Sequence, residues 1–233
     1  MGGLWVPDEG FVWSRDEDFL SEVYPSPLEG VGVDEVYKAL GLAKELHAGQ
    51  VRRGNGEPYY LHPLGVARVL HGYGFRDPPT LCAALLHDTA EDSKEHKHSP
   101  EDLLDLVERD FSSGVAGAVA LLSKNVGLKW NQVEPDAGEY IARLAQAYDP
   151  RVRVVKLADL GVNTLDPHNL SSQGLLEKVT MGINYREWGA DVSRKIQGKR
   201  KWACHRGWEG AKPWALAYFI DENLDAYRRQ FDF

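Results

Sequence analysis

Apolar and polar positions alternate with a helical period through the middle of the chain. After Asp34, a suitable N-cap, apolar side chains recur at steps of three and four residues on one face as far as His47. The run 99–102, Ser-Pro-Glu-Asp, combines a hydroxyl cap, a proline in the first turn and two acids at the positive end of the helix dipole. Apolar residues at helical spacing then continue from Leu103 to Leu122. This pattern predicts a mostly α-helical domain.

Further segments fit helices less uniformly. Residues 62–69, 81–87 and 140–147 have the length and apolar content of helices, and an amphipathic stripe runs from Pro213 to the end of the chain. The valines of 152–155 are equally compatible with a strand, because so short a run has no decisive period.

The chain shows no internal repeat and no linker between domains. Residues 1–33 hold tryptophans and prolines without periodicity, so we expect an irregular N-terminal arm. Residues 34–233 are then expected to form one domain, with a helical C-terminal extension over 170–233.

Composition narrows the function classes. The 233 residues are 43% hydrophobic and 27% charged, as in ordinary globular proteins. A net charge of −8, from 27 Lys and Arg against 35 Asp and Glu, disfavours dedicated nucleic-acid binding. No apolar stretch approaches the roughly 18 residues of a membrane span, and the N-terminus lacks the features of a secretory signal. Cys82 and Cys204 are the only cysteines, too few for a disulfide-stabilised scaffold, so we expect the protein to reside in a reducing cytoplasm.

The residues that best indicate a chemical function are the ionisable ones at the end of the apolar run 81–87. His87 and Asp88 are adjacent, and Glu91 and Asp92 follow four residues after each. On a continuing helix, this spacing would stack two polar pairs side by side. Imidazole and carboxylate groups bind divalent cations, and further carboxylates nearby can position or deprotonate an attacking water. The alternative is a helix end that simply enters an acidic loop.

Other blocks of the sequence favour the metal-site interpretation. His62 lies in Pro-Tyr-Tyr-Leu-His-Pro (58–63), and Asp159 ends Val-Lys-Leu-Ala-Asp (155–159). The order His62, His87-Asp88, Asp159 resembles the HD superfamily of metal-dependent phosphohydrolases. The blocks at 47–53, 56–67, 83–92, 122–124, 140–141 and 155–163 resemble, more narrowly, the hydrolase domain of the RelA/SpoT homologues and the small alarmone hydrolases. The motif core covers residues 35–166.

This resemblance implies an all-α fold, an HD-domain helical bundle in which 152–155 is helical. It implies one Mn²⁺ per chain, held by His62, His87, Asp88 and Asp159. It also implies that Glu91 and Asp92 act on the water that attacks phosphorus, so that the 3′-pyrophosphate of (p)ppGpp is released with GDP or GTP.

Substrate contacts carry over from the same family. Arg53 matches an arginine that packs near the purine, and Asn163 matches an asparagine near the sugar and phosphates. Lys124 either favours an anionic ligand or is a solvated lysine at a helix end. The chain departs from the family pattern at Gly54 and at 160–162, Leu-Gly-Val, which leaves the choice between guanine and adenine alarmones, (p)ppGpp and (p)ppApp, open.

Two alternatives have different chemistry. One is an HD-type nucleotidase or phosphatase acting on nucleoside monophosphates or NADPH, and the other is a catalytically silent HD domain that binds a nucleotide. The expected partner is a small nucleotide substrate, and we expect no association with a membrane. Two further partners stay open: a second copy of the chain in a homo-oligomer, and a cognate toxic synthetase for which the chain is the antitoxin. The basic segment 194–206 fits either a phosphate clamp or a solvated loop, and the nearby tryptophans Trp202, Trp208 and Trp214 are expected to pack onto the core.

Overall fold

The computed structural model of the chain describes residues 33–52, 56–91, 98–124, 126, 137–165, 192, 208, 211–212, 216, 218 and 220. The helices of this described part are α2 (Val33–Leu46), α3 (Leu61–Gly72), α4 (Pro78–Leu86), α5 (Pro100–Asp110), α6 (Ser113–Leu122), α7 (Ala137–Gln146) and α8 (Pro150–Leu165). The β pairing within it is limited to one isolated antiparallel bridge between Val51 and Pro58. The prediction of an all-α fold is confirmed.

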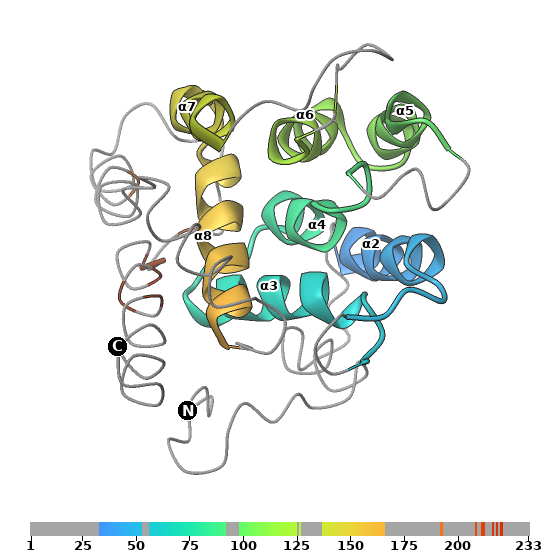
Figure 1. The fold of residues 1–233 in the computed structure, drawn as a ribbon, viewed down its shortest axis with the longest axis horizontal. Coiled ribbons are helices and arrows are strands. Elements are labelled where there is room, and N and C mark those ends of the chain that lie inside the picture. Colours follow the sequence, from blue (N-terminus) through green and yellow to red (C-terminus); the bar gives the residue numbers. More distant parts are fainter. Residues whose placement is uncertain are drawn as a thin grey trace.

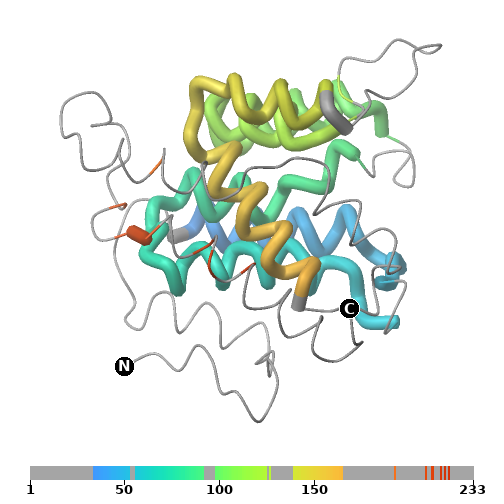
Figure 2. The backbone as a smooth tube through the Cα atoms, turned by 60° about the vertical axis from the view of Figure 1, so that its left-hand side comes forward, coloured from blue at the N-terminus to red at the C-terminus, as the bar shows by residue number. Residues whose placement is uncertain are grey.

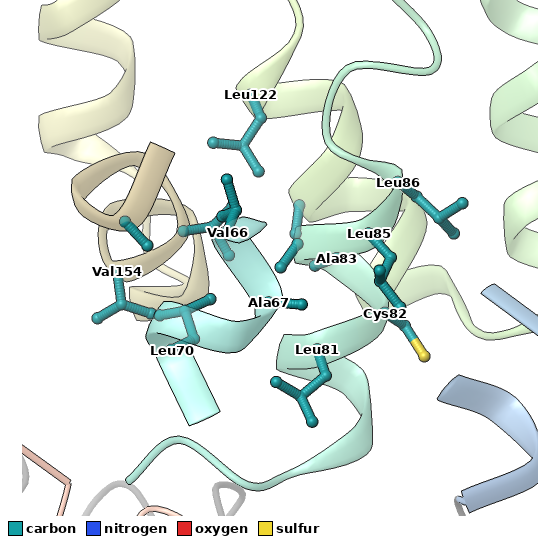
Figure 3. Packing of buried hydrophobic residues seen from close by; sticks show 14 of the residues in the cluster. Val66, Ala67, Leu70, Leu81, Cys82, Ala83, Leu85, Leu86, Leu122 and Val154 are labelled. Atoms are coloured by element: carbon teal, nitrogen blue, oxygen red, sulfur yellow. The ribbon is translucent and has the colours of Figure 1, made fainter. Parts of the chain in front are cut away.

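Helix α4 lies in the middle of the bundle and packs against α2, α3, α6 and α8 (Figure 1). Residues 81–86 are completely buried, and Figure 3 shows five of them, Leu81, Cys82, Ala83, Leu85 and Leu86, among other residues of the core. A helix that is apolar all round belongs in the core rather than at the surface. It begins at Asp77, whose carboxylate accepts a hydrogen bond from the Thr80 N–H at 3.0 Å, and two prolines fill its first turn. The element that ends in the His-Asp pair is therefore the central helix.

Helix α8 runs across α3 and also contacts α4, α6 and α7 (Figure 2). The valine run that periodicity left open is helical, and Val152, Val154 and Val155 are all completely buried. Burial against several neighbouring helices overrides the preference of β-branched residues for strands. The helix that the family resemblance implied for this segment is confirmed.

Helices α5 and α6 begin where capping signals predict. Ser99 and Asp102 form a reciprocal capping box, with Ser99 Oγ accepting from the Asp102 N–H at 3.0 Å and the Ser99 N–H donating to Asp102 at 3.1 Å. Ser112 caps α6 through the Val115 N–H at 3.2 Å. The single apolar pattern between Leu103 and Leu122 is thus divided into two helices by a second hydroxyl cap.

Trp208, far away in the sequence, packs against residues 73–77, which connect α3 to α4. Its indole Nε1–H donates to the Asp77 carboxylate, and its ring meets that of Phe75 edge-on with centroids 4.9 Å apart. The Lys212 N–H donates to the Tyr73 carbonyl at 2.9 Å. Trp208 is 2% exposed, which confirms for this tryptophan the prediction of packing onto the core.

Several expectations lie outside the described residues. They include the arm up to residue 32, Trp202, Trp214, Cys204 and the basic segment 194–206. Of the C-terminal stripe, Leu216 and Ile220 are buried and Tyr218 is exposed. The boundaries of the arm and the extension stay predictions. None of the helices in the described ranges combines the length and apolar character that crossing a membrane requires.

Candidate metal centre and active site

Four predicted metal ligands converge from three helices that pack on one another. His62 lies in the first turn of α3, His87 and Asp88 directly follow α4, and Asp159 lies in the second half of α8. Because α4 contacts both α3 and α8, the end of α4 meets the other two ligands inside the bundle. His62, His87 and Asp159 are at most 4% exposed. The fold therefore buries a cluster of ionisable groups that would be costly if left without a charge partner.

The distances within this cluster suit a single small cation. His62 Nε2 lies 3.1 Å from Asp159 Oδ1 and 3.5 Å from Asp88 Oδ2. His87 Nε2 lies 3.1 Å from Asp88 Oδ1. One ligand atom each from His62, His87 and Asp159 fall within 4.8 Å of one another, and Asp88 adjoins this group. Ligands about 2.0–2.2 Å from a shared cation are separated by distances of this order.

The His87 ring is oriented as in a metal ligand. Its Nδ1 lies 2.8 Å from the Ala84 carbonyl oxygen, a partner that fixes the ring and directs Nε2 into the cluster. Nε2 is buried and makes no hydrogen bond within the described residues, but it lies 3.1 Å from Asp88 Oδ1 and 3.8 Å from Asp159 Oδ1. Burial lowers the pKa of His87, but Asp88 and Asp159 outweigh burial and raise the pKa to about 10. The pocket therefore favours positive charge at Nε2, and the donor set fits a divalent cation.

The two carboxylate ligands are held by neighbours of different kinds. Asp159 Oδ2 accepts a hydrogen bond from Lys156 Nζ at 2.7 Å, and Asp159 Oδ1 accepts one from Asn163 Nδ2 at 2.6 Å. Burial opposes ionisation of Asp159, but Lys156 and the two histidines hold its pKa well below the usual range. Asp88 Oδ2 accepts a hydrogen bond from the Tyr59 hydroxyl at 3.0 Å. Such outer partners orient the ligands of metal sites.

Helix α4 ends earlier than its sequence predicts. The helix expected over 81–87 stops at Leu86, and residues 87–91 form turns. The His87 ring makes a hydrogen bond through Nδ1 with the Ala84 carbonyl oxygen. Thr89 donates two hydrogen bonds to the Leu86 carbonyl oxygen, from its N–H at 3.1 Å and from its hydroxyl at 2.7 Å. These bonds satisfy carbonyls that a further helical turn would use. The expectation that two polar pairs stack on a continuing helix is therefore wrong.

Glu91, the predicted general base, lies in this turn and is partly exposed. Glu91 Oε2 accepts a hydrogen bond from the Lys124 N–H at 3.3 Å, and Glu91 Oε1 lies 4.0 Å from Lys124 Nζ. Burial and the neighbouring Asp88 raise the pKa of Glu91, although Lys124 and Lys156 act in the opposite direction. A carboxylate with a raised pKa is a better proton acceptor than an ordinary one. Asp92, its predicted partner, lies outside the described residues.

The predicted substrate contacts are only partly visible. Arg53 lies outside the described residues, and Lys124 lies beside Glu91 with 42% of its side chain exposed. Asn163, 9% exposed, joins Asp159 to Arg52, because Arg52 Nη2 donates to Asn163 Oδ1 at 3.4 Å. Leu160, in the segment that departs from the family pattern, is buried in the core cluster.

Sequence reasoning missed three residues at the site. Arg52 was overlooked in favour of its neighbour Arg53, although both belong to the same basic pair in the sequence. The tyrosine hydroxyl of Tyr59 contacts Asp88, and its position three residues before His62 was the only available signal. Arg143, on α7, contacts the end of α6 and had no signal at all, because the contact joins residues 20 apart through packing.

Comparison with known proteins agrees with this geometry. Residues 39–174, more than half of the chain, match the family model described as the HD domain. Human guanosine-3′,5′-bis(diphosphate) 3′-pyrophosphohydrolase MESH1 is 33% identical over 171 residues, which cover 72% of this chain and 87% of that protein. The guanosine-3′,5′-bis(diphosphate) 3′-pyrophosphohydrolase of Aquifex aeolicus is 35% identical over 174 residues, or 73% of this chain and 23% of that protein.

Longer relatives share only a part of their length with this chain. The GTP pyrophosphokinase of Streptomyces coelicolor is 38% identical over 125 residues, which cover 54% of this chain and 14% of the relative. The chain thus spans between 14% and 23% of the length of the GTP pyrophosphokinases of Streptomyces and Myxococcus and of the Aquifex protein.

One solved structure has the same fold. It is described as a metazoan orthologue of SpoT that hydrolyses ppGpp and plays a role in starvation responses, and it superposes with a TM-score of 0.54 at 23% identity. The match covers 84% of this chain and 94% of that one. The family expected from the sequence motifs is confirmed: the chain belongs to the HD-domain family and is a homologue of the guanosine-3′,5′-bis(diphosphate) 3′-pyrophosphohydrolase MESH1.

Proposed function

We propose that this protein is a Mn²⁺-dependent hydrolase that removes the 3′-pyrophosphate of (p)ppGpp, giving pyrophosphate and GDP or GTP. The observation that carries the proposal is the convergence of His62, His87 and Asp159, with His87 Nε2 directed at the carboxylates of the cluster. The relative MESH1, most of whose length this chain matches, bears the name of that activity.

His62, His87, Asp88 and Asp159 would hold one cation. Two imidazoles and two carboxylates form a mixed nitrogen and oxygen site that can bind a divalent cation, and the family resemblance implies that this cation is Mn²⁺. When bound, the cation supplies charge neutralisation at phosphoryl oxygens and acidifies water. Burial lowers the pKa of His62, against the opposing effects of Asp159 and Asp88, and so favours the neutral imidazole that a metal ligand requires.

Glu91 is the proposed general base, with Asp92 as its partner. Its carboxylate takes a proton from the attacking water as the new phosphorus–oxygen bond forms and the bond to the 3′ oxygen breaks. The Lys124 N–H donates to Glu91 Oε2 and so helps to orient the carboxylate. Burial and Asp88 raise the pKa of Glu91, which makes its carboxylate a stronger proton acceptor than an ordinary one.

The nucleotide is proposed to lie between Arg53, at the purine, and Asn163 and Lys124, at the sugar and phosphates. Arg52 is proposed to line the same side of the nucleotide site as Asn163, because Arg52 Nη2 donates to Asn163 Oδ1. The proposal extends to adenine alarmones such as (p)ppApp, since the segment 160–162 departs from the family pattern beside Asn163. The proposal also places the enzyme in the cytoplasm, where it serves either general stress signalling or, as an antitoxin, the removal of the product of a toxic alarmone synthetase.

The test is a product assay on metal-stripped protein, with and without added Mn²⁺. The substrates are ppGpp, pppGpp, ppApp, NADPH and deoxynucleoside monophosphates. Mn²⁺-dependent release of pyrophosphate from the alarmones is the expected result, and their relative rates give the base preference. Orthophosphate from NADPH or the monophosphates would overturn the proposal in favour of a phosphatase. Bound Mn²⁺ without turnover of any compound would overturn the proposal in favour of a catalytically silent HD domain.

A further inference from the structure

Two side chains of α7 bind the carbonyl groups at the end of α6. The Tyr140 hydroxyl donates to the Leu122 carbonyl oxygen at 2.5 Å, and Arg143 Nη2 donates to the Ser123 carbonyl oxygen at 2.7 Å. The last carbonyls of a helix have no partner within the helix and usually face solvent or a backbone cap. Tyr140 and Arg143 are three residues apart and lie on one face of α7, so they bind successive carbonyls together.

The residue that follows these carbonyls contacts the proposed general base. Lys124 N–H donates to Glu91 Oε2 at 3.3 Å, and Lys124 Nζ lies 4.0 Å from Glu91 Oε1. The peptide unit that carries the Ser123 carbonyl also carries the Lys124 N–H. Fixing that carbonyl with Arg143 therefore fixes the direction of the N–H that holds Glu91.

The Tyr140 ring adds a second connection at the same place. Lys124 Nζ lies 5.7 Å from the ring centroid, Arg143 Cζ 5.2 Å and Lys156 Nζ 5.5 Å, all within cation–π range. Lys156 in turn binds Asp159. The buried ring thus lies between the lysine beside Glu91 and the lysine beside the metal cluster, and its hydroxyl stays protonated because burial raises the pKa of Tyr140 to about 12.

We propose that Tyr140 and Arg143 are positioning residues that orient Glu91 through the backbone of residues 122–124. Neither residue is placed against the reacting atoms, so their effect passes through the Lys124 N–H. This inference rests on the proposed role of Glu91 as the general base. It predicts that α7 affects turnover, while the affinity for the cation depends on the ligands of α3, α4 and α8.

The variants separate positioning from packing. Arg143→Met keeps the aliphatic stem and removes the donors, whereas Arg143→Lys retains a donor and a charge for the Ser123 carbonyl. Tyr140→Phe keeps the ring and removes only the hydroxyl. Arg151→Met is the matched control, because Arg151 is a half-buried arginine at the start of α8 whose partner is Asp149.

Turnover gives the first measurement. We expect Arg143→Met and Tyr140→Phe to lower kcat by roughly 10-fold or more, as misplacement of a catalytic group does, with KM changed by less than about 3-fold. The Mn²⁺ dissociation constant, measured by titration calorimetry, stays within about 3-fold of the wild-type value, since no ligand contact is removed. Arg143→Lys recovers most of kcat, and Arg151→Met retains it. Wild-type kcat in both Arg143→Met and Tyr140→Phe would overturn the inference.

A double-mutant cycle shows whether the effect passes through Glu91. In a Glu91→Gln background, Arg143→Met should cause little further loss of kcat, because residues that act through one group are not additive. Losses that multiply would mean that Arg143 acts independently, which would contradict the inference.

Hydrogen–deuterium exchange tests the geometry without any substrate. The Lys124 amide should exchange roughly 10-fold faster in Arg143→Met and in Tyr140→Phe than in the wild type, with Arg143→Lys close to the wild type. If the wild type turned over no nucleotide but this pattern appeared, the proposed function would fail while the positioning contact stood. If the wild type turned over ppGpp but exchange was unchanged in both variants, the positioning inference alone would fail.

Discussion

Lys156 Nζ lies 2.7 Å from Asp159 Oδ2, and the two residues form an ion pair one helical turn apart on α8, in which Asp159 is buried and Lys156 is partly buried. The lysine engages one oxygen of the carboxylate, while the other oxygen faces His62. Burial alone would lower the pKa of Lys156, but Asp159 outweighs it, and the lysine stays charged. The pair therefore keeps Asp159 ionised and leaves its other oxygen facing the histidines of the proposed metal site.

Replacing Lys156 with methionine should damage both metal binding and stability. Asp159 would lose the partner that fixes its orientation, so we expect Mn²⁺ affinity to fall roughly 10–100-fold. A buried carboxylate without its partner should also cost about 3–5 kcal/mol in the free energy of unfolding. Titration calorimetry and urea unfolding measure the two effects. Lys38→Met, which removes an exposed lysine paired with Asp110, is the control and should cost less than about 1 kcal/mol.

Asp159 itself tests the metal assignment. We expect Asp159→Asn to reduce Mn²⁺ affinity by more than about 100-fold, beyond the loss of an outer partner, and to abolish hydrolysis. Asparagine retains the shape of the side chain, so the fold should survive, as circular dichroism would show. Asp105→Asn, at an exposed position on α5, should keep both properties. Full Mn²⁺ binding by Asp159→Asn would remove Asp159 from the ligand set.

The residues proposed as metal ligands could be predicted from the sequence, because histidine and aspartate occur there in short motifs in a fixed order. His62, His87, Asp88 and Asp159 occur in ordered motifs, and the Ser99 cap predicts the start of α5 because its signal is local. The end of α4 was misplaced because side chains that take helix carbonyls leave no periodic pattern.

Contacts between residues of separate helices could not be predicted from the sequence, because they depend on how the helices pack. The bond between the Lys124 N–H and Glu91 spans 33 residues and involves the backbone, which carries no sequence signal. The Tyr59 bond to Asp88 likewise depends on how α3 and α4 pack. Such contacts become visible only once the packing of the helices is known.

Trp208 gives a prediction about the attachment of the C-terminal part of the chain. Trp208→Phe keeps an aromatic ring against Phe75 but removes the Nε1–H that Asp77 accepts. Because a buried carboxylate loses one of its donors, we expect a loss of about 1–3 kcal/mol in the free energy of unfolding. Urea unfolding measures it, with Tyr148→Phe at a 92% exposed position as the control. Equal stability of the two variants would show that the bond contributes nothing.

The role of Glu91 can be separated from that of the metal ligands. Glu91→Gln removes the proton acceptor but keeps an oxygen for the Lys124 N–H. We expect kcat to fall by roughly 10²-fold or more, the scale of losing a general base, while Mn²⁺ binding is unchanged. Steady-state kinetics with ppGpp and metal titration provide the two measurements, and Glu108→Gln on the exposed side of α5 is the matched control. A kcat close to that of the wild type would exclude Glu91 as the base.

The pH dependence of hydrolysis should report on Lys124. Glu91 must be ionised to accept a proton, so activity falls as the pH drops through its pKa. Burial and Asp88 raise this pKa, and Lys124 lowers it by favouring the charged form. Removing the charge in Lys124→Met should therefore raise the pKa of Glu91 further and move the acidic limb of the kcat profile to higher pH.

Lys124→Arg is the matched control for this shift, because it keeps a positive charge beside Glu91. Its acidic limb should stay close to that of the wild type. Since 42% of the Lys124 side chain is exposed, the difference between Lys124→Met and the wild type should also shrink as salt is added. An acidic limb that stays in place in Lys124→Met, or moves to lower pH, would show that the lysine does not act on Glu91 through its charge. A shift that persisted unchanged at high salt would point instead to the altered backbone of residues 122–124.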